Sequence, residues 1–302
     1  MKITILDGYT MNPGDLSWEE LEALGELKVY DRTSPEDIVS RISDSYAIFT
    51  NKCCITADVM DSCPDLKFIG VLATGFDNID VAAARKRNIA ICNVPAYSTE
   101  GVAQHTFALL LELCNHVGLH NDSVQRGGWC ACPDYSMVIK PMLQLSGKAM
   151  GIIGYGNIGR RVGQIAEAFG MKVFSYSQNP EAVMNCDVIS VHCPATAENK
   201  GFINKEFISK LKDGALLINT ARGALINEMD LAEALKTGKL AGAAVDVVSK
   251  EPIEKDNPLL GVPNLFITAH MAYSSIEARR TVCSTSAANL RAFLRGEELN
   301  RL

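Results

Sequence analysis

The sequence has no excess of basic residues and no long hydrophobic run. Among its 302 residues, 29 Lys and Arg stand against 35 Asp and Glu, which gives a formal net charge of −6 at pH 7. A nucleic-acid surface needs clustered Lys and Arg, and no such cluster is present. The longest apolar stretches are well short of the roughly 20 residues that span a bilayer. We therefore expect neither a nucleic-acid-binding protein nor a membrane protein.

The sequence also lacks the marks of an exported protein or a metal site. Its first residues, MKITILDGYT, contain no apolar segment or cleavage site typical of a secretory signal. The ten cysteines are scattered through expected strands and helices, which favours buried free thiols over disulfides. Cys130 and Cys132 have no second pair to complete a zinc site. We expect a cytoplasmic protein without a bound metal.

What the sequence does contain is a regular alternation of β-like runs and helical patterns. This alternation predicts parallel sheets with helices on both faces, and the length predicts two domains. A first series of expected strands reads KITILD, LKVYD, YAIFTN, LKFIGVL and IAICNVP. A second reads AMGIIGYG, KVFSYS, CDVISVHC, ALLINTA, AGAAVDV and NLFITAH. The predicted fold class is α/β, with two doubly wound parallel-sheet domains, the larger a Rossmann dinucleotide-binding domain.

The domain boundaries follow from the two series. We expect a substrate-binding domain of residues 1–97 plus 283–302 and a dinucleotide-binding domain of residues 98–282. A final helix near residues 276–295 is expected to return to the first domain. The segment 99–120 contains VAQHTFALLLEL, which is apolar nearly all round and predicts a helix buried between domains or between subunits. We therefore also expect a homodimer.

A glycine-rich turn, GYGNIG, follows the first strand of the second series and opens a helix. Gly154 permits the tight turn, Gly156 lets the backbone approach a pyrophosphate, and Gly159 lets helix and strand pack closely. The helix N-terminus supplies N–H groups and partial positive charge. The alternative is a purely structural turn, but strand, turn and helix stand in the order that favours dinucleotide binding.

The second strand of this series does not decide between NAD and NADP. An acidic residue at its end would bind the ribose hydroxyl of NAD and repel the extra phosphate of NADP. KVFSYS instead ends at Ser177, followed by Gln178 and Asn179, with neither an acid nor an arginine. We expect NAD as the cofactor and leave NADP open.

Polar residues gather where the expected strands end, which is where open α/β sheets bind ligands. Thr74 and Gly75 follow one strand of the first series, and Arg222, Asp246 and His270 follow strands of the second. Glu251 lies five residues after Asp246. An amide-rich turn, a guanidinium, a carboxylate and an imidazole are the groups needed to hold a 2-oxo acid and to protonate its carbonyl oxygen.

Seven collinear blocks of this sequence resemble the D-isomer-specific 2-hydroxyacid dehydrogenase family. Besides the glycine turn they are LATGFDNID, NVPAYSTEGVAQHTFALLLEL, HCPATAENKGFIN, INTARGALINEMDLAEAL, AVDVVSKEP and TAHMAYSS. The second of these most resembles the glycerate dehydrogenase (hydroxypyruvate reductase) branch. The resemblance implies NAD(P)H-dependent reduction of a small 2-oxo acid, hydroxypyruvate or glyoxylate, to the D-2-hydroxy acid, and the reverse reaction.

The resemblance also implies the catalytic roles. Arg222 binds the substrate carboxylate, since its planar fork matches a carboxylate bidentately. His270 is the general acid during reduction, and Glu251 pairs with it and favours the charged imidazolium. The backbone of Ala73, Thr74 and Gly75 is expected to hold the substrate carboxylate as well. The implied cofactor contacts are Thr74, Gly154, Gly156, Asn157, Ile158, Gly159, Ser177, Cys193, Pro194, Thr220, Ala221, Asp246 and His270.

Several of these residues have a simpler interpretation. Asp246 is also explained as a structural acid at a strand end, and Glu251 as a loop carboxylate. His192 is interpreted as scaffolding of the cofactor loop, and His105 and His116 as core or interface residues of the apolar helix.

Two departures from the family pattern leave the substrate open. Tyr273 stands where many relatives carry tryptophan, and Asn157 replaces an arginine of the glycine turn. One alternative is a dehydrogenase of D-lactate or another D-2-hydroxy acid. An alternative of a different class is a nicotinamide-sensing, corepressor-like binding protein.

Overall fold

The computed structural model describes all residues from 1 to 302. The chain forms two compact units. Unit 1 comprises Met1–Ser98 and Ser274–Leu302, and unit 2 comprises Thr99–Tyr273. Each unit has its own parallel sheet, so the predicted α/β class with two parallel-sheet domains is confirmed.

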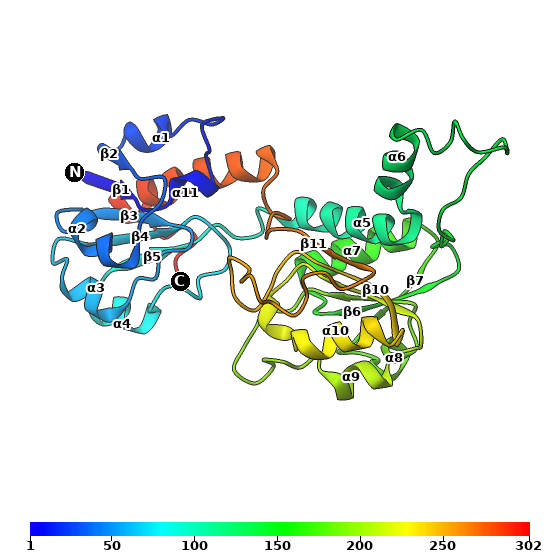
Figure 1. The fold of residues 1–302 in the computed structure, drawn as a ribbon. Coiled ribbons are helices and arrows are strands. Elements are labelled where there is room, and N and C mark those ends of the chain that lie inside the picture. The colour runs from blue at the N-terminus through cyan, green and yellow to red at the C-terminus, as the bar shows by residue number, and fades with distance from the viewer. The chain divides into compact units, whose positions relative to one another are not determined.

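Unit 1 contains a five-stranded parallel sheet in the order β2-β1-β3-β4-β5. The strands are β1 (Lys2–Ile5), β2 (Glu26–Val29), β3 (Ala47–Thr50), β4 (Phe68–Val71) and β5 (Ala90–Cys92). One face carries α2 (Ile38–Ile42), α3 (Ala57–Asp61) and α4 (Val81–Lys86), and the other carries α1 (Glu19–Glu22) and α11 (Ile276–Leu294) (Figure 1). Short 3-10 turns occupy Gly8–Thr10 and Pro35–Asp37.

The two strands β3 and β4 of unit 1 are buried along their whole length. All four residues of β3 and all four of β4 are buried, as expected for strands covered on both faces. The expected cap of α4 is also present: the Asp80 carboxylate accepts a hydrogen bond from the Ala83 N–H at 2.8 Å. On the opposite face, Phe293 of α11 packs its ring 5.3 Å from that of Phe68.

Unit 2 contains a six-stranded parallel sheet in the order β11-β10-β9-β8-β6-β7. The strands are β6 (Ala149–Ile153), β7 (Lys172–Ser175), β8 (Val188–Val191), β9 (Ala215–Asn219), β10 (Leu240–Val245) and β11 (Leu265–Ile267). Successive connections run in opposite directions from β6, so the topological switch point lies between β6 and β8, and ligands of this fold bind beside such a point.

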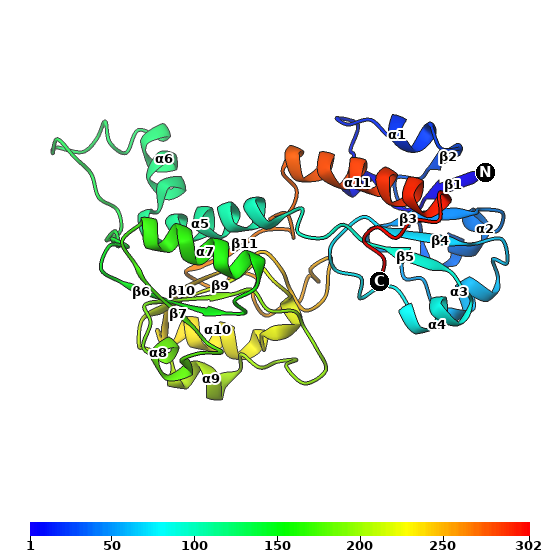
Figure 2. The ribbon, with the colours of Figure 1, turned by 180° about the vertical axis from the view of Figure 1, so that it is seen from behind.

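Helices cover both faces of the unit 2 sheet (Figures 1 and 2). One face carries α5 (Thr99–Asn115) and α7 (Asn157–Ala168), and the other carries α8 (Pro180–Met184), α9 (Lys205–Lys210) and α10 (Glu228–Lys236). A 3-10 turn occupies Gly223–Leu225. Two separate buried clusters, one on each face, form the core.

The apolar face of α5 is covered by unit 2 itself. Phe107, Leu110 and Leu113 belong to the same buried cluster as Ile152 of β6 and Val162 of α7. The prediction that this segment is one helix buried between domains or between subunits is therefore corrected in two respects. Its apolar side chains pack on their own sheet and on α7, and the helix ends at Asn115.

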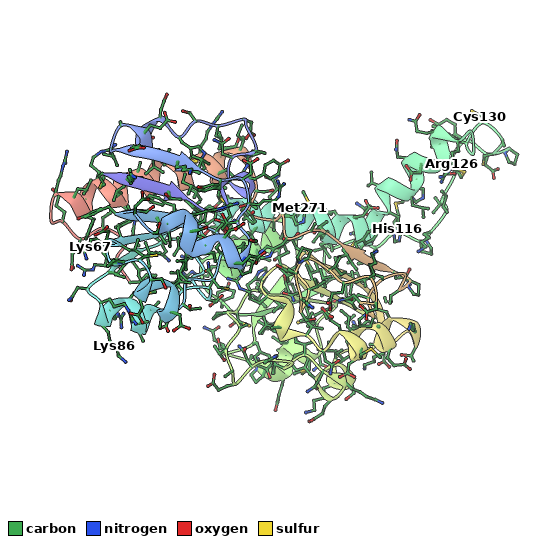
Figure 3. The ribbon with its side chains drawn as sticks, turned by 60° about the vertical axis from the view of Figure 1, so that its left-hand side comes forward. Lys67, Lys86, His116, Arg126, Cys130 and Met271 are labelled. Carbon is green, nitrogen blue, oxygen red and sulfur yellow. The ribbon has the colours of Figure 1, made fainter.

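A second helix and a long loop project from the end of α5. His116 has a left-handed backbone with φ 51°, which breaks the helix, and α6 (Val117–Gln125) follows it. Figure 3 shows α6 and the following loop, with the labelled Arg126 and Cys130, extending away from the sheet of unit 2. We call residues 117–143 the arm.

The C-terminal helix lies wholly in unit 1. The expected boundary between residues 282 and 283 falls inside α11, which is one continuous helix from Ile276 to Leu294. Its contacts are with α1, β4 and β5, so the chain passes to unit 1 before the helix begins, at residue 274. None of the helices in the chain is long and apolar enough to cross a membrane.

Candidate active site

The glycine turn of unit 2 is so tightly packed that side chains are excluded at two positions. Gly154 has φ 96°, and a Cβ there would lie 2.4 Å from the Cys193 nitrogen. A Cβ at Gly159 would lie 2.1 Å from the carbonyl oxygen of Gly154. Both distances are shorter than any van der Waals contact, so these glycines let the strand, the turn and α7 approach one another.

The middle glycine has open space instead. A Cβ at Gly156 would meet nothing within 4 Å, although the turn around it is dense. This opening lies at the N-terminus of α7, where N–H groups and partial positive charge favour a phosphate. Arg160 adds a full charge beside it, because its Nη2 donates to Asn157 Oδ1 at 2.7 Å. The turn therefore fits a dinucleotide pyrophosphate, and Arg160 brings a guanidinium where Asn157 lacks one.

In the next two loops of this edge, the residues nearest the strand ends are uncharged. After β7, Ser177 Oγ lies 3.0 Å from Ser175 Oγ. After β8, the His192 N–H donates to Ile153 O at 2.7 Å, which ties the Cys193 loop to the glycine turn. The His192 Nε2 lies 2.7 Å from Ser190 Oγ, and burial lowers the pKa of His192 to about 3. The ring is neutral at pH 7, in agreement with a scaffolding role.

Arg222 lies in the loop after β9 and is held by a buried asparagine. Asn219, the last residue of β9, is fully buried; its Oδ1 accepts from the Ala221 N–H at 3.0 Å and its Nδ2 donates to Arg222 O at 2.9 Å. A Cβ at Gly223 would lie 2.0 Å from the carbonyl carbon of Val248. The Arg222 loop therefore packs directly on the loop that carries Glu251.

Glu251 joins this second loop to a third. Its Oε1 accepts from the Val248 N–H at 3.2 Å, and its Oε2 lies 2.6 Å from His270 Nδ1. The His270 side chain is 24% exposed and that of Glu251 is 34% exposed, so ligands can reach the pair. Because Nδ1 faces the carboxylate, Nε2 is the ring nitrogen left to exchange a proton with a substrate.

Asp246 fixes the backbone around His270. Its side chain is 1% exposed, and its two oxygens accept from the N–H groups of Met271 and Ala272 at 2.9 and 2.8 Å and from Thr268 Oγ1 at 2.6 Å. Burial acts to raise the pKa of Asp246, but the neighbouring His105 ring and the hydrogen bonds from Thr268 and the two backbone N–H groups outweigh it and lower the pKa. The residue is an anion at neutral pH, in agreement with a structural role at the strand end.

Comparison with known proteins identifies the family. The family description "D-isomer specific 2-hydroxyacid dehydrogenase, NAD binding domain" matches residues 107–272, more than half of the chain. The chain belongs to the D-isomer-specific 2-hydroxyacid dehydrogenase family. Unit 2 is its NAD-binding domain, as the glycine turn predicts.

Full-length relatives support the same assignment. A hydroxypyruvate reductase from Blautia hydrogenotrophica is 47% identical over 99% of each chain. A solved acyclic imino acid reductase in complex with NADPH and D-Arg has 30% identity and a TM-score of 0.87 over the whole of both chains. A D-lactate dehydrogenase from Aquifex aeolicus, solved with NAD and lactic acid, has 28% identity and a TM-score of 0.83 over 98% of this chain and 96% of that one. Solved relatives of this fold thus occur with either nicotinamide cofactor.

The three residues expected in unit 1 lie in the loop after β4 of this dehydrogenase. Thr74 Oγ1 donates to Val94 O at 2.7 Å, and the Val94 N–H donates to Ala73 O at 3.0 Å. Asn93 Nδ2 donates to Thr74 O at 2.8 Å, and α11 supports Asn93 because Asn289 Nδ2 donates to Asn93 O at 2.9 Å. The Thr74 side chain therefore holds the loop in place.

The structure adds four polar residues that sequence reasoning missed. Asn219 holds the Arg222 loop, and Thr268 bonds to Asp246. His105 and Thr106, both on α5, bond to Thr268 and to Thr220. The sequence carries a signal for two of them: Asn219 is the last residue of the strand before Arg222, and Thr268 directly follows the strand before His270. It carries none for His105, whose partner lies 163 residues away. The centroid of the Tyr273 ring lies 6.0 Å from that of the His270 ring, which places this departure from the family pattern beside the predicted proton donor.

Proposed function

We propose that the protein reduces hydroxypyruvate or glyoxylate to the corresponding D-2-hydroxy acid and catalyses the reverse reaction on D-glycerate. The observation that carries the proposal is the 2.6 Å pair between His270 Nδ1 and Glu251 Oε2, packed against the Arg222 loop through Gly223. The 47% identity to a hydroxypyruvate reductase supports the choice of acid. When bound, NADH or NADPH supplies the hydride that adds to the carbonyl carbon.

Arg222 is proposed to bind and orient the substrate. Its guanidinium is planar and permanently charged, so it can hold a carboxylate through two parallel hydrogen bonds and fix the direction of the neighbouring carbonyl. Asn219 and Gly223 hold the backbone on both sides of it, which limits the freedom of the side chain before substrate arrives. In unit 1, the amides of Thr74 and Gly75 are proposed as a further carboxylate site, with Ala73 as the flanking residue.

His270 is proposed to donate the proton. During reduction, its Nε2–H gives a proton to the carbonyl oxygen as negative charge develops there, so no free alkoxide accumulates. The Glu251 carboxylate accepts a hydrogen bond from Nδ1–H and stabilises the imidazolium before transfer. In the oxidative direction the neutral Nε2 takes the hydroxyl proton instead.

The remaining predicted residues are proposed as cofactor contacts. The backbone at Gly156, Asn157 and Ile158 would face the pyrophosphate, and Ser177 would face the adenosine ribose. The other proposed contacts are Thr74, Gly154, Gly159, Cys193, Pro194, Thr220, Ala221, Asp246 and His270. Because no carboxylate follows β7, we propose that both NADH and NADPH bind, with a preference for NADH.

A substrate panel tests this proposal. We expect the protein to oxidise NADH or NADPH, measured as loss of the reduced-nicotinamide absorbance. Hydroxypyruvate and glyoxylate should be the best substrates. D-Glycerate with NAD should reverse the signal, whereas L-glycerate is the matched control and should give none. Absence of turnover with every 2-oxo acid and both cofactors would overturn the proposal and favour a cofactor-sensing binding protein.

D-Lactate dehydrogenase is the second candidate. It is favoured by the similarity to the Aquifex aeolicus enzyme solved with lactic acid. Pyruvate differs from hydroxypyruvate only by a hydroxyl group, and a site built to bind that group discriminates strongly against its absence. We expect kcat/KM for hydroxypyruvate to exceed that for pyruvate by at least about tenfold. The reverse order would favour the second candidate.

We also propose that the chain forms a homodimer through the arm. Tyr135 is 97% exposed, and Val117, Val138 and Met142 are each at least 60% exposed. Exposed apolar groups of this density usually mark a contact with another protein. Light scattering should give twice the chain mass of 32.7 kDa, and the double variant Tyr135→Asp with Val138→Asp should give the monomer. A wild-type monomer at micromolar concentration would contradict the proposal.

A cytoplasmic location is part of the same proposal. All ten cysteines are free thiols in this structure, and burial raises the pKa of Cys92, Cys114 and Cys186 to about 11. Unreactive buried thiols of this kind are typical of proteins in a reducing compartment.

A further inference from the structure

Helix α5 contacts two of the loops that carry the proposed catalytic residues. The His105 ring nitrogen Nε2 lies 3.0 Å from Thr268 Oγ1, two residues before His270. The neighbouring Thr106 Oγ1 lies 3.0 Å from Thr220 Oγ1, two residues before Arg222. Adjacent residues of one helix therefore hold the loops after β11 and after β9.

The direction of the hydrogen bonds in the first contact follows from counting hydrogens. Asp246 is a carboxylate and can only accept, so the 2.6 Å contact uses the single hydroxyl hydrogen of Thr268. Thr268 Oγ1 then has only lone pairs to offer His105. The His105 Nε2 must therefore carry a hydrogen and donate it, which sets a chain from His105 through Thr268 to Asp246.

This chain ends on the backbone of the proposed proton donor. The Asp246 carboxylate accepts hydrogen bonds from the backbone N–H groups of Met271 and Ala272. The backbone carbonyl oxygen of Asp246 accepts from the backbone N–H of His270 at 2.7 Å. The backbone of His270 has φ 50°, a left-handed conformation that is uncommon for residues other than glycine and that the surroundings must stabilise. The Asp246 contacts impose it, and they direct the imidazole toward Glu251.

We propose that His105 is a positioning residue for the proposed reaction, acting through Thr268 and Asp246 to hold the His270 ring on Glu251. The inference rests on the proposed function for its kinetic meaning, but the geometry that it describes exists without substrate. His105 Nε2 also lies 3.6 Å from Asp246 Oδ1, so it contacts both ends of the Thr268 bridge. The side chain is 18% exposed and turns its polar edge to this carboxylate.

Two substitutions at one position test the proposal. His105→Leu fills similar space but cannot donate, whereas His105→Gln places an amide N–H near the position of Nε2. Gln104→Ala, at an exposed neighbour on the same helix, is the matched control. We expect His105→Leu to lower kcat about tenfold, since small misplacement of a catalytic group costs up to about a hundredfold. His105→Gln should stay within about threefold of wild type, and Gln104→Ala should be unchanged.

Three further measurements separate positioning from general damage. The KM for the 2-oxo acid and the Kd for NADH, measured by nicotinamide fluorescence, should change less than twofold in His105→Leu. Thr268→Val, which breaks the same chain at its middle, should match it, and the two together should cost no more than either alone. Equal losses in His105→Leu and His105→Gln, or a kcat of His105→Leu within twofold of wild type, would overturn the proposal.

A spectroscopic readout keeps the test independent of turnover. The chain has only five histidines, so 15N labelling of the imidazoles gives a simple spectrum in which the variant His270→Asn identifies the His270 signals. We expect these signals to move in His105→Leu and Thr268→Val and to stay in place in His105→Gln and Gln104→Ala. If the wild type reduced no 2-oxo acid, the proposed function would fail while these shifts still decided the positioning role. Unmoved His270 signals in His105→Leu would refute it.

Discussion

Both units build a parallel sheet with helices on its two faces, yet the loops at the carboxyl ends of their strands do different work. In unit 1, the loop after β4 uses the Thr74 hydroxyl to fasten itself to Val94 and has backbone amides to offer a ligand. In unit 2, the loops after β9, β10 and β11 present Arg222, Glu251 and His270, whose side chains are ionisable. The same fold thus carries an amide-rich turn after β4 in one unit and three ionisable side chains after β9, β10 and β11 in the other, so the difference lies in the loops and not in the sheets.

The largest expected effects come from removing charged side chains of unit 2. Arg222→Ala and His270→Ala should each lower kcat/KM by about a hundredfold or more, because each removes stabilisation of charge in the transition state. Arg222→Lys keeps the charge but loses the planar fork, and should recover only part of the loss. Steady-state kinetics with hydroxypyruvate measure all three.

The control for these variants lies in unit 1. Arg87→Ala removes an arginine that pairs with Asp61 on the surface and should leave the kinetics unchanged. Near-normal rates in Arg222→Ala or His270→Ala would show that the assigned role is wrong.

A change of cofactor preference is the next largest expected effect. Ser177→Asp places a carboxylate where NADPH would carry its additional phosphate, so electrostatic repulsion should shift the ratio of kcat/KM toward NADH by about tenfold. Ser177→Asn is the neutral control of similar size and should shift the ratio less than twofold. An unchanged ratio in Ser177→Asp would place the adenosine ribose elsewhere.

For a substitution in unit 1, we expect a change in the free energy of unfolding, in contrast to the changes in reaction rate expected for unit 2. Thr74→Val removes the hydroxyl that donates to Val94 O, which should lower the free energy of unfolding by about 1 kcal/mol. The backbone amides remain, so kcat should stay within about twofold of wild type. Chemical denaturation and kinetics on the same sample test both parts. A large loss of kcat without loss of stability would mean that the Thr74 hydroxyl acts on the substrate, and the contrast between the units would fail.

A further expected effect is a dependence of stability on pH that originates in unit 2. Burial lowers the pKa of His192 from 6.5 to about 3, so the folded chain keeps the ring neutral while the unfolded chain protonates it below pH 6.5. The folded state therefore has its full stability, as far as His192 is concerned, above pH 6.5. The free energy of unfolding then falls progressively as the pH decreases from 6.5 toward 3. Between pH 7 and pH 5, Tm should fall less in His192→Gln than in wild type. Equal falls in the two proteins would show that His192 does not contribute.

Local patterns in the sequence predicted most of the fold. The eleven strands follow from short apolar runs bounded by turns, and the glycine turn from the order of strand, turn and helix. Arg222, Glu251 and His270 were proposed because they lie in loops that follow strands and because family motifs supported the choice, and their roles stay predictions. These features depend on neighbours in the chain, which a sequence displays directly.

What the sequence could not predict depends on partners that are distant along the chain. Periodicity placed His105 on an apolar helix but could not reveal Thr268, which only the folded sheet brings next to it. The break at His116 carries no proline or glycine signal, because a histidine adopts the left-handed conformation there. The returning helix was expected near residues 276–295, but the sequence does not show that all of it packs on unit 1, so the expected boundary fell inside α11.

Gly223 has a consequence for how this enzyme could be altered. Its α-carbon packs against the Val248 carbonyl with no space for even a methyl group, so the Arg222 loop and the Glu251 loop are in direct backbone contact at this residue. A displacement of the Arg222 loop would therefore be transmitted to the loop that carries Glu251. Remodelling the Arg222 loop would therefore also disturb the contact between Glu251 and His270, so changes of specificity are better designed at residues outside these two loops.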